Sequence, residues 1–210
     1  MDLFSTEQSV SVDFKILVVC TGNICRSPLA AQYFSDELAN LGVVTVQSAG
    51  TMALVGQDMP CQARELAVRR GRTPKPHVAQ LLTPELVADA DLVVAMSRDH
   101  RKAVVSSFPR AAAYTFTLRE FERLARTMSR SDLHAAREKP DIAPRLRGAV
   151  AAVASRRGLV PQPTDSAEDD VVDPYRQADT VFDQTGAQLY PAADVIVHVL
   201  RSAAMPDARS

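Results

Sequence analysis

The chain has 210 residues, of which 46% are hydrophobic and 23% are charged, a composition typical of a folded globular protein. Its net charge of -1 gives no reason to expect a nucleic-acid partner, and no apolar stretch is long enough to span a bilayer, so no membrane partner is expected either. The three cysteines do not suggest a disulfide framework, which makes reactive thiol chemistry in a reducing compartment the better hypothesis.

The first half of the chain alternates between predicted strands and helices. Residues 1–12 are expected to be a disordered leader without a signal-peptide pattern, which favours a cytoplasmic location. Residues 14–19 form an apolar run typical of a buried parallel strand, and an amphipathic helix is predicted at 29–38. Further strands are predicted at 43–47, 91–96 and 111–116, and further helices at about 60–70, 98–108 and 117–128. This order predicts a three-layer α/β fold with a central four-stranded parallel sheet flanked by helices.

The second half is less regular. Residues 129–167 contain one clear helical pattern, at 144–157, and the acidic stretch at 164–170 predicts a mobile loop. One or two closing helices are expected at 179–189 and 192–204.

Cys20 stands at the carboxyl end of the first predicted strand, where open parallel sheets bind their ligands. The loop that follows leads directly into a helix, so its backbone N–H groups and the helix dipole favour an anion. Arg26 offers a planar guanidinium that matches two phosphate oxygens. The same donors stabilise a thiolate, which makes Cys20 a candidate nucleophile. The other residues of this predicted phosphate-binding loop are Thr21, Gly22, Asn23, Ile24, Cys25 and Ser27.

Residues 19–28, Val-Cys-Thr-Gly-Asn-Ile-Cys-Arg-Ser-Pro, resemble the signature of the low-molecular-weight protein tyrosine phosphatases. Three further segments match that family in the expected order, namely residues 48–51, residues 90–96 and Asp173-Pro-Tyr175. The resemblance covers about residues 14–116 and 170–204, and it implies that the phosphate loop follows the first strand.

The resemblance implies a single phosphatase domain over residues 13–205. Typical members lack the segment at about 129–167, which would be inserted between the fourth strand and Asp173. We expect this segment either to form a helical cap beside the active site or to decorate the surface.

By the same resemblance, Cys20 would attack phosphorus and form a cysteinyl-phosphate intermediate. Arg26 and the loop amides would stabilise the phosphate oxygens in the transition state. Asp173 would first protonate the leaving oxygen and then activate water. No metal or other cofactor is needed for this chemistry.

Other residues of the family pattern are expected to support the loop. Ser48 and His77 match positions that brace it by hydrogen bonds together with Asn23 and Ser27. Cys25 matches a second cysteine that can form a disulfide with the nucleophile and protect it from irreversible oxidation.

The predicted substrate wall departs from the family. Leu54 lies in a loop that usually carries an aromatic residue, so Tyr175 would supply the aromatic wall. Arg176 replaces a second aromatic residue and would favour acidic peptides or additional phosphate groups. The expected substrate is a phosphorylated protein, with phosphotyrosine as the first hypothesis and a small phosphorylated metabolite as the alternative.

Two other functions compete with this hypothesis. A thiol-dependent arsenate reductase uses a similar Cys-x5-Arg loop, but it needs a relay of further cysteines, and only Cys61 lies downstream of the loop. A non-catalytic phosphate-binding module would normally have lost Cys20, Arg26 or Asp173. The plainer alternatives are a buried inert thiol for Cys20, a turn residue for Asp173 and a structural role for His77.

Overall fold

The computed structural model describes residues 13–206, and the predicted leader at 1–12 lies outside the described residues. Four parallel strands form one sheet in the order β2-β1-β3-β4. Their bounds are Phe14–Cys20 for β1, Val44–Gly50 for β2, Leu92–Ala95 for β3 and Thr115–Thr117 for β4. Cys20 pairs with Gly50 and Val19 pairs with Ala95, so β1, β2 and β3 end at the same edge of the sheet.

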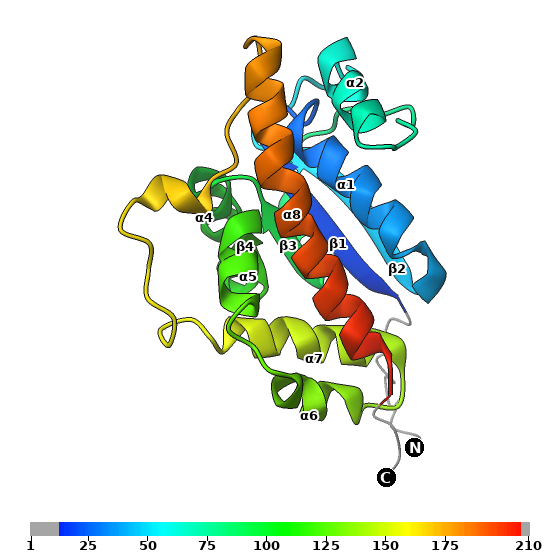
Figure 1. Ribbon diagram of the computed structural model, residues 1–210, viewed down its shortest axis with the longest axis vertical. Coiled ribbons are helices and arrows are strands. Elements are labelled where there is room, and N and C mark those ends of the chain that lie inside the picture. The colour runs from blue at the N-terminus through cyan, green and yellow to red at the C-terminus, as the bar shows by residue number, and fades with distance from the viewer. Residues whose placement is uncertain (1–12, 207–210) are drawn as a thin grey trace, which may run out of the picture.

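Helices cover both faces of this sheet (Figure 1). One face packs against α1 (Arg26–Glu37), α5 (Leu118–Ala125), α7 (Ile142–Ala154) and α8 (Asp179–Ala204). The other face packs against α3 (Pro84–Ala88) and α4 (Arg98–Ser107). The short helices α2 (Cys61–Arg69) and α6 (His134–Arg137) contact α8. The predicted three-layer α/β fold is therefore confirmed.

The apolar run of β1 explains why the sheet is buried on both faces. Ile16 and Val18 pack into the larger core, while Leu17 and Val19 pack into the smaller core on the opposite face. Alternate side chains of a strand point to opposite faces, so a strand covered on both sides needs a continuous apolar sequence. None of the helices in residues 13–206 has the length and apolar character that crossing a membrane requires.

One predicted strand differs from the structure. The strand predicted at 111–116 is wrong in its first part, because Pro109–Ala113 forms a 3-10 helix and β4 has only three residues. Pro109 lies in the first turn of this 3-10 helix, where its fixed φ is favourable, and the Arg157 guanidinium donates to the carbonyl oxygens of Ala112 and Thr115. The closing segment, expected to form one or two helices, is one helix of 26 residues, α8, which continues through Pro191.

The segment expected to be an insertion places its helices far from the end of β1. Arg147 of α7 pairs with Asp91, just before β3, and donates to the carbonyl oxygen of Asp13, just before β1. Figure 1 shows α6 and α7 at one end of the sheet and the start of α8 at the other. The alternative of a helical cap beside Cys20 is therefore wrong. Only the chain that leaves α7 returns toward Cys20.

Candidate active site

The loop between β1 and α1 folds around the sulfur of Cys20. Asn23 has a left-handed backbone (φ 54°) and its N–H donates to Cys20 Sγ at 3.3 Å. Ser27 Oγ lies 2.9 Å from the same sulfur. Cys25 is the N-cap of α1, so Arg26 opens the helix. The positive end of this helix faces the loop and favours a negative charge there.

The Asn23 side chain connects the loop to its surroundings. Its Nδ2 donates to Ser27 Oγ at 2.9 Å and to Ser48 Oγ at 2.8 Å. Its Oδ1 accepts the Gln80 N–H at 2.9 Å. His77 Nε2 lies 2.6 Å from the backbone carbonyl oxygen of Asn23. The structure thus brings Ser48 and His77 to the loop, as the sequence predicted, and adds Gln80, which the sequence did not single out.

The three thiols differ in burial and in the hydrogen-bond donors around them. Burial, followed by the charges of Cys20 and Asp173, raises the pKa of the Cys25 thiol to about 12, so Cys25 stays protonated at neutral pH. Cys61 is exposed on α2. Because Ser27 Oγ already accepts an amide hydrogen, its own hydrogen is available to the Cys20 sulfur. Cys20 is the only one of the three that has donors arranged for a thiolate.

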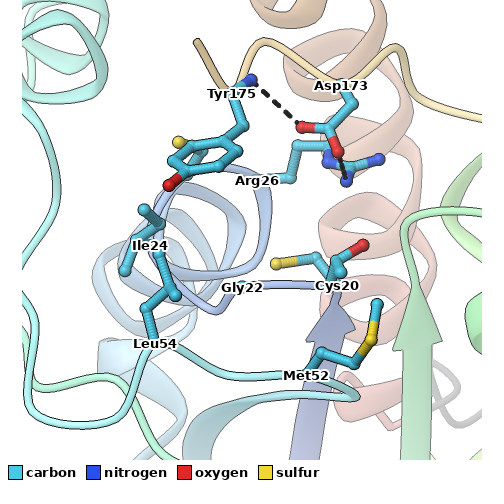
Figure 2. Close-up of a pocket in the computed structure, with 10 residues that line it drawn as sticks. Cys20, Gly22, Ile24, Arg26, Met52, Leu54, Asp173 and Tyr175 are labelled. Carbon is cyan, nitrogen blue, oxygen red and sulfur yellow. Dashed lines mark hydrogen bonds and ion pairs between the residues drawn. The ribbon is translucent and has the colours of Figure 1, made fainter.

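Arg26 joins the loop to a distant part of the chain. Its guanidinium is buried and donates from Nη1 to the Val171 carbonyl oxygen at 3.1 Å and from Nη2 to Asp173 Oδ2 at 2.5 Å. Asp173 Oδ1 accepts the Tyr175 N–H at 3.2 Å, and Figure 2 shows both contacts beside Cys20. The predicted nucleophile, phosphate clamp and acid therefore meet at one site.

A cavity of about 160 Å³ opens above the Cys20 loop. Ile24, Leu54 and Tyr175 lie on one side of it in Figure 2, and Met52 lies beside Cys20. The predicted wall residues Leu54 and Tyr175 thus line the cavity. Arg176 does not line it, and its guanidinium instead lies 5.0 Å from the centre of the Tyr175 ring.

The apolar wall is tied to the phosphate loop through the backbone. Met52 N–H donates to the Thr21 carbonyl oxygen and Leu54 N–H donates to the Gly22 carbonyl oxygen, both at 3.0 Å. A Cβ at Gly50 would lie 2.4 Å from the Thr21 carbonyl oxygen, so this close approach requires glycine. These two backbone hydrogen bonds fix the position of Leu54 relative to the phosphate loop. Within residues 13–206, no group of three or more His, Cys, Asp or Glu side chains could hold a metal ion.

His100 is a site residue that the sequence reasoning missed. Its Nε2 lies 2.8 Å from Thr21 Oγ1 and its Nδ1 lies 2.8 Å from Ser97 Oγ. Ser97 caps α4 and accepts the His100 N–H. A capping serine with a histidine three residues later, just after the third strand, could have indicated a side chain at this edge of the sheet.

We expect His100 to make the protein less stable in acid. Burial, followed by the charge of Arg26, lowers the pKa of His100 to about 4, whereas the unfolded chain has the ordinary value of 6.5. The unfolded state therefore binds a proton first as the pH falls, and stability present above pH 6.5 is lost progressively down to about pH 4. Between pH 7 and pH 4 the wild type should lose about 3 kcal/mol more unfolding free energy than His100→Gln. Urea denaturation of both proteins measures this difference, and equal losses would contradict it.

Comparison with known proteins finds that the chain is similar to phosphatases. The sequence profile of the low molecular weight phosphotyrosine protein phosphatases matches residues 15–134. The low molecular weight protein-tyrosine-phosphatase Ptp of Acinetobacter johnsonii is 38% identical over 103 residues, 49% of this chain and 70% of that protein. The protein-arginine-phosphatase of Bacillus subtilis (strain 168) is 39% identical over 107 residues, 50% of this chain and 71% of that protein.

Solved structures agree over most of the chain. The YwlE arginine phosphatase from Geobacillus stearothermophilus has a TM-score of 0.63 at 26% identity, with 90% of this chain and 93% of that chain covered. Wzb from Vibrio vulnificus, in complex with benzylphosphonate, has a TM-score of 0.61 at 25% identity, with 89% of this chain and 98% of that chain covered.

Proposed function

The chain belongs to the low molecular weight phosphotyrosine protein phosphatase family, and from this membership we propose that Cys20, Arg26 and Asp173 carry out its reaction. Members of this family are cysteine-dependent phosphatases, and the chain is an enzyme of that class. The observation that carries the assignment is the contact between Arg26 and Asp173 in the same cavity as Cys20. A cysteine-to-serine mutant of the YwlE arginine phosphatase with a phosphorylated active-site serine supports attack on phosphorus from this position.

The proposed reaction has two steps. In the first, Cys20 Sγ forms a bond to phosphorus, the bond from phosphorus to the leaving oxygen breaks, and that oxygen takes a proton from Asp173. In the second, Asp173 accepts a proton from water, the water oxygen attacks phosphorus and the S–P bond breaks to release inorganic phosphate. Arg26 and the loop N–H groups bind the phosphate oxygens in both steps. Ser48 and His77 hold the loop in shape through Asn23.

Arg26 must change partners when phosphate binds. Its Nη2 donates to Asp173 Oδ2, and the oxygens of a bound phosphate would compete for the same guanidinium. A phosphate dianion also repels the Asp173 carboxylate, which favours the protonated carboxyl group that the first step requires. Substrate binding therefore converts Asp173 from an ion-pair partner into a proton donor.

The cavity walls favour an aromatic phosphate. Ile24, Leu54 and Tyr175 present apolar surface to the group that carries the phosphate, and Wzb of Vibrio vulnificus binds the aromatic benzylphosphonate. A phosphoarginine side chain brings N–H donors that need acceptors when they are buried. Asp173 is the single carboxylate among the cavity-lining residues, and the proposed first step needs it protonated, as a donor rather than an acceptor. We therefore infer that the substrate is a protein phosphorylated on tyrosine.

A substrate panel tests this inference. The kcat/KM for a phosphotyrosine peptide should exceed that for the matching phosphoarginine peptide by about 100-fold, because the site would leave guanidinium donors unpaired. A sugar phosphate serves as the small-metabolite comparison. Turnover of the phosphoarginine peptide or the sugar phosphate equal to that of phosphotyrosine would contradict the inference while leaving the phosphatase reaction intact.

The Leu54 wall provides a sharper form of the same test. Leu54→Asn should lower kcat/KM for the phosphotyrosine peptide about tenfold, since it replaces apolar contact with an amide, and should leave inhibition by inorganic phosphate unchanged. Val55→Asn is the matched control, because Val55 is adjacent but 68% exposed. Equal effects of the two variants would mean that Leu54 does not contact the substrate.

The remaining proposals concern the setting of the enzyme. Residues 13–205 would form one phosphatase domain with 129–167 as an inserted segment, and the need for a reduced Cys20 favours the cytoplasm.

Arg176 would contact acidic residues beside the phosphotyrosine, since it lies outside the cavity next to Tyr175. Arsenate reduction is not favoured, because Cys61 is the single cysteine downstream of the loop and is exposed on α2.

A further inference from the structure

Asp169 is a buried carboxylate that the proposed reaction does not use. It is 3% exposed and lies at the end of a 3-10 turn, Ser166–Asp169, in the chain that returns from α7. Arg98 Nη2 and Arg123 Nη2 each lie 3.2 Å from Asp169 Oδ2. The mobile loop predicted at 164–170 is therefore wrong for its final residues.

The two arginines come from the body of the fold. Arg98 opens α4, directly after β3, and Arg123 belongs to α5. Each also binds the same returning chain a second time: Arg98 Nη2 donates to Gln162 Oε1 at 2.9 Å and Arg123 Nη1 donates to the Pro161 carbonyl oxygen at 3.1 Å. The carboxylate of Asp169 is thus fixed from two helices at once.

The residues after Asp169 are also held, each by a different element. Asp170 Oδ1 accepts the Arg98 N–H at 2.8 Å. Val171 N–H donates to the Met96 carbonyl oxygen at 2.9 Å, at the end of β3. Val172 N–H donates to Gln188 Oε1 of α8 at 2.9 Å. Asp173 comes next and is itself 47% exposed at its side chain, so its position depends on the chain leading to it.

We propose that Asp169, clamped by Arg98 and Arg123, is a positioning residue that sets the height of the Asp173 carboxyl group above Cys20. This inference rests on the proposed function, because it assigns a purpose to the approach of the acid loop. A buried ion pair is a costly way to gain stability alone, but it fixes geometry when several charged hydrogen bonds converge on it. General acid catalysis depends on that geometry, since a displacement of about 1 Å can cost on the order of 100-fold in rate.

The proposal predicts a specific kinetic signature for Asp169→Asn. The ratio of kcat/KM for phenyl phosphate to kcat/KM for 4-nitrophenyl phosphate should fall about tenfold, because kcat/KM reports the step in which the leaving group departs and only the poorer leaving group needs the proton from Asp173. Inhibition by inorganic phosphate should remain within about twofold of wild type, since the Cys20 loop is untouched. In the Asp173→Ala background, the same substitution should leave the ratio unchanged.

A second variant covers the case in which Asp169→Asn does not fold. Arg123→Gln keeps Arg98 on the carboxylate and should lower the ratio in the same direction by a smaller factor. The matched controls are Arg126→Gln, which removes an exposed ion pair with Glu122, and Asp165→Asn, an exposed acid of the same segment. Both controls should keep the wild-type ratio.

Three outcomes would overturn the proposal. An equal loss of kcat/KM with both aryl phosphates in Asp169→Asn would make Asp169 a structural residue only. A further fall of the kcat/KM ratio in the Asp173→Ala background would mean that Asp169 acts through another group. Both results would leave the proposed function standing. No hydrolysis of either aryl phosphate by the wild type would overturn the proposed function, and this proposal with it.

Discussion

Replacing Cys20 by serine should lower steady-state kcat for an aryl phosphate by at least about 10⁴-fold. Three donors surround the Cys20 sulfur: the N–H of Asn23, the hydroxyl of Ser27 and the positive end of α1 all face it. A serine hydroxyl is far harder to deprotonate than a thiol, and an alkoxide is a poorer leaving group than a thiolate in the second step. The S–P intermediate that carries the reaction cannot form in this variant.

The controls separate chemistry from folding. Cys61→Ser should keep wild-type activity, because Cys61 is exposed on α2. Wild-type affinity for inorganic phosphate in Cys20→Ser, measured by calorimetry, would show that the loop is intact, since Arg26 and the backbone donors remain. Rapid acid quench of the wild type should trap phosphate on Cys20. Turnover by Cys20→Ser within tenfold of wild type would overturn the nucleophile assignment.

The phosphate loop could be predicted from sequence because its chemistry is local. Cys20, the loop amides and Arg26 lie within one strand–loop–helix unit, so their spacing in the chain nearly determines their spacing in space. The supporting residues Ser48 and His77 came from the resemblance, and the structure places both against Asn23. The alternation of strands and helices predicted a four-stranded parallel sheet because crossovers follow general rules, whereas the strand order β2-β1-β3-β4 depends on long-range pairing and was not predicted.

The parts that could not be predicted depend on contacts between distant elements. His100 contacts Thr21 at the edge of the sheet. Asp169 forms ion pairs with Arg98 and Arg123, which precede it in the chain by the whole of the segment that contains α7. A composition of acidic and small residues indicates a loop, but it does not show which carboxylate will be buried by arginines elsewhere. The 3-10 helix before β4 is likewise contacted from far along the chain, since Arg157 donates to the carbonyl oxygen of Ala112.

Removing the carboxyl group of Asp173 should separate substrates by their leaving groups. In Asp173→Ala, kcat/KM for phenyl phosphate should fall about 100- to 1000-fold, because kcat/KM reports the step in which the leaving group departs and the departing oxygen receives no proton. The loss for 4-nitrophenyl phosphate should be smaller, since its departing oxygen is stable as an anion. The carboxyl group lies where this proton is needed, beside Arg26 in the cavity that contains Cys20.

Phosphate binding gives an independent check on the same variant. Asp173 occupies one arm of the Arg26 guanidinium, and its negative charge opposes a bound phosphate. Asp173→Ala should therefore bind inorganic phosphate at least as tightly as the wild type, even though its catalysis is impaired. Asp179→Ala, an exposed acid at the start of α8, should change neither property. Weaker phosphate binding in Asp173→Ala, together with equal losses of kcat/KM on both aryl phosphates, would mean that Asp173 shapes the site rather than donating a proton. The combination of tighter binding and slower turnover with poor leaving groups is expected only if one carboxyl group both restrains Arg26 and protonates the product.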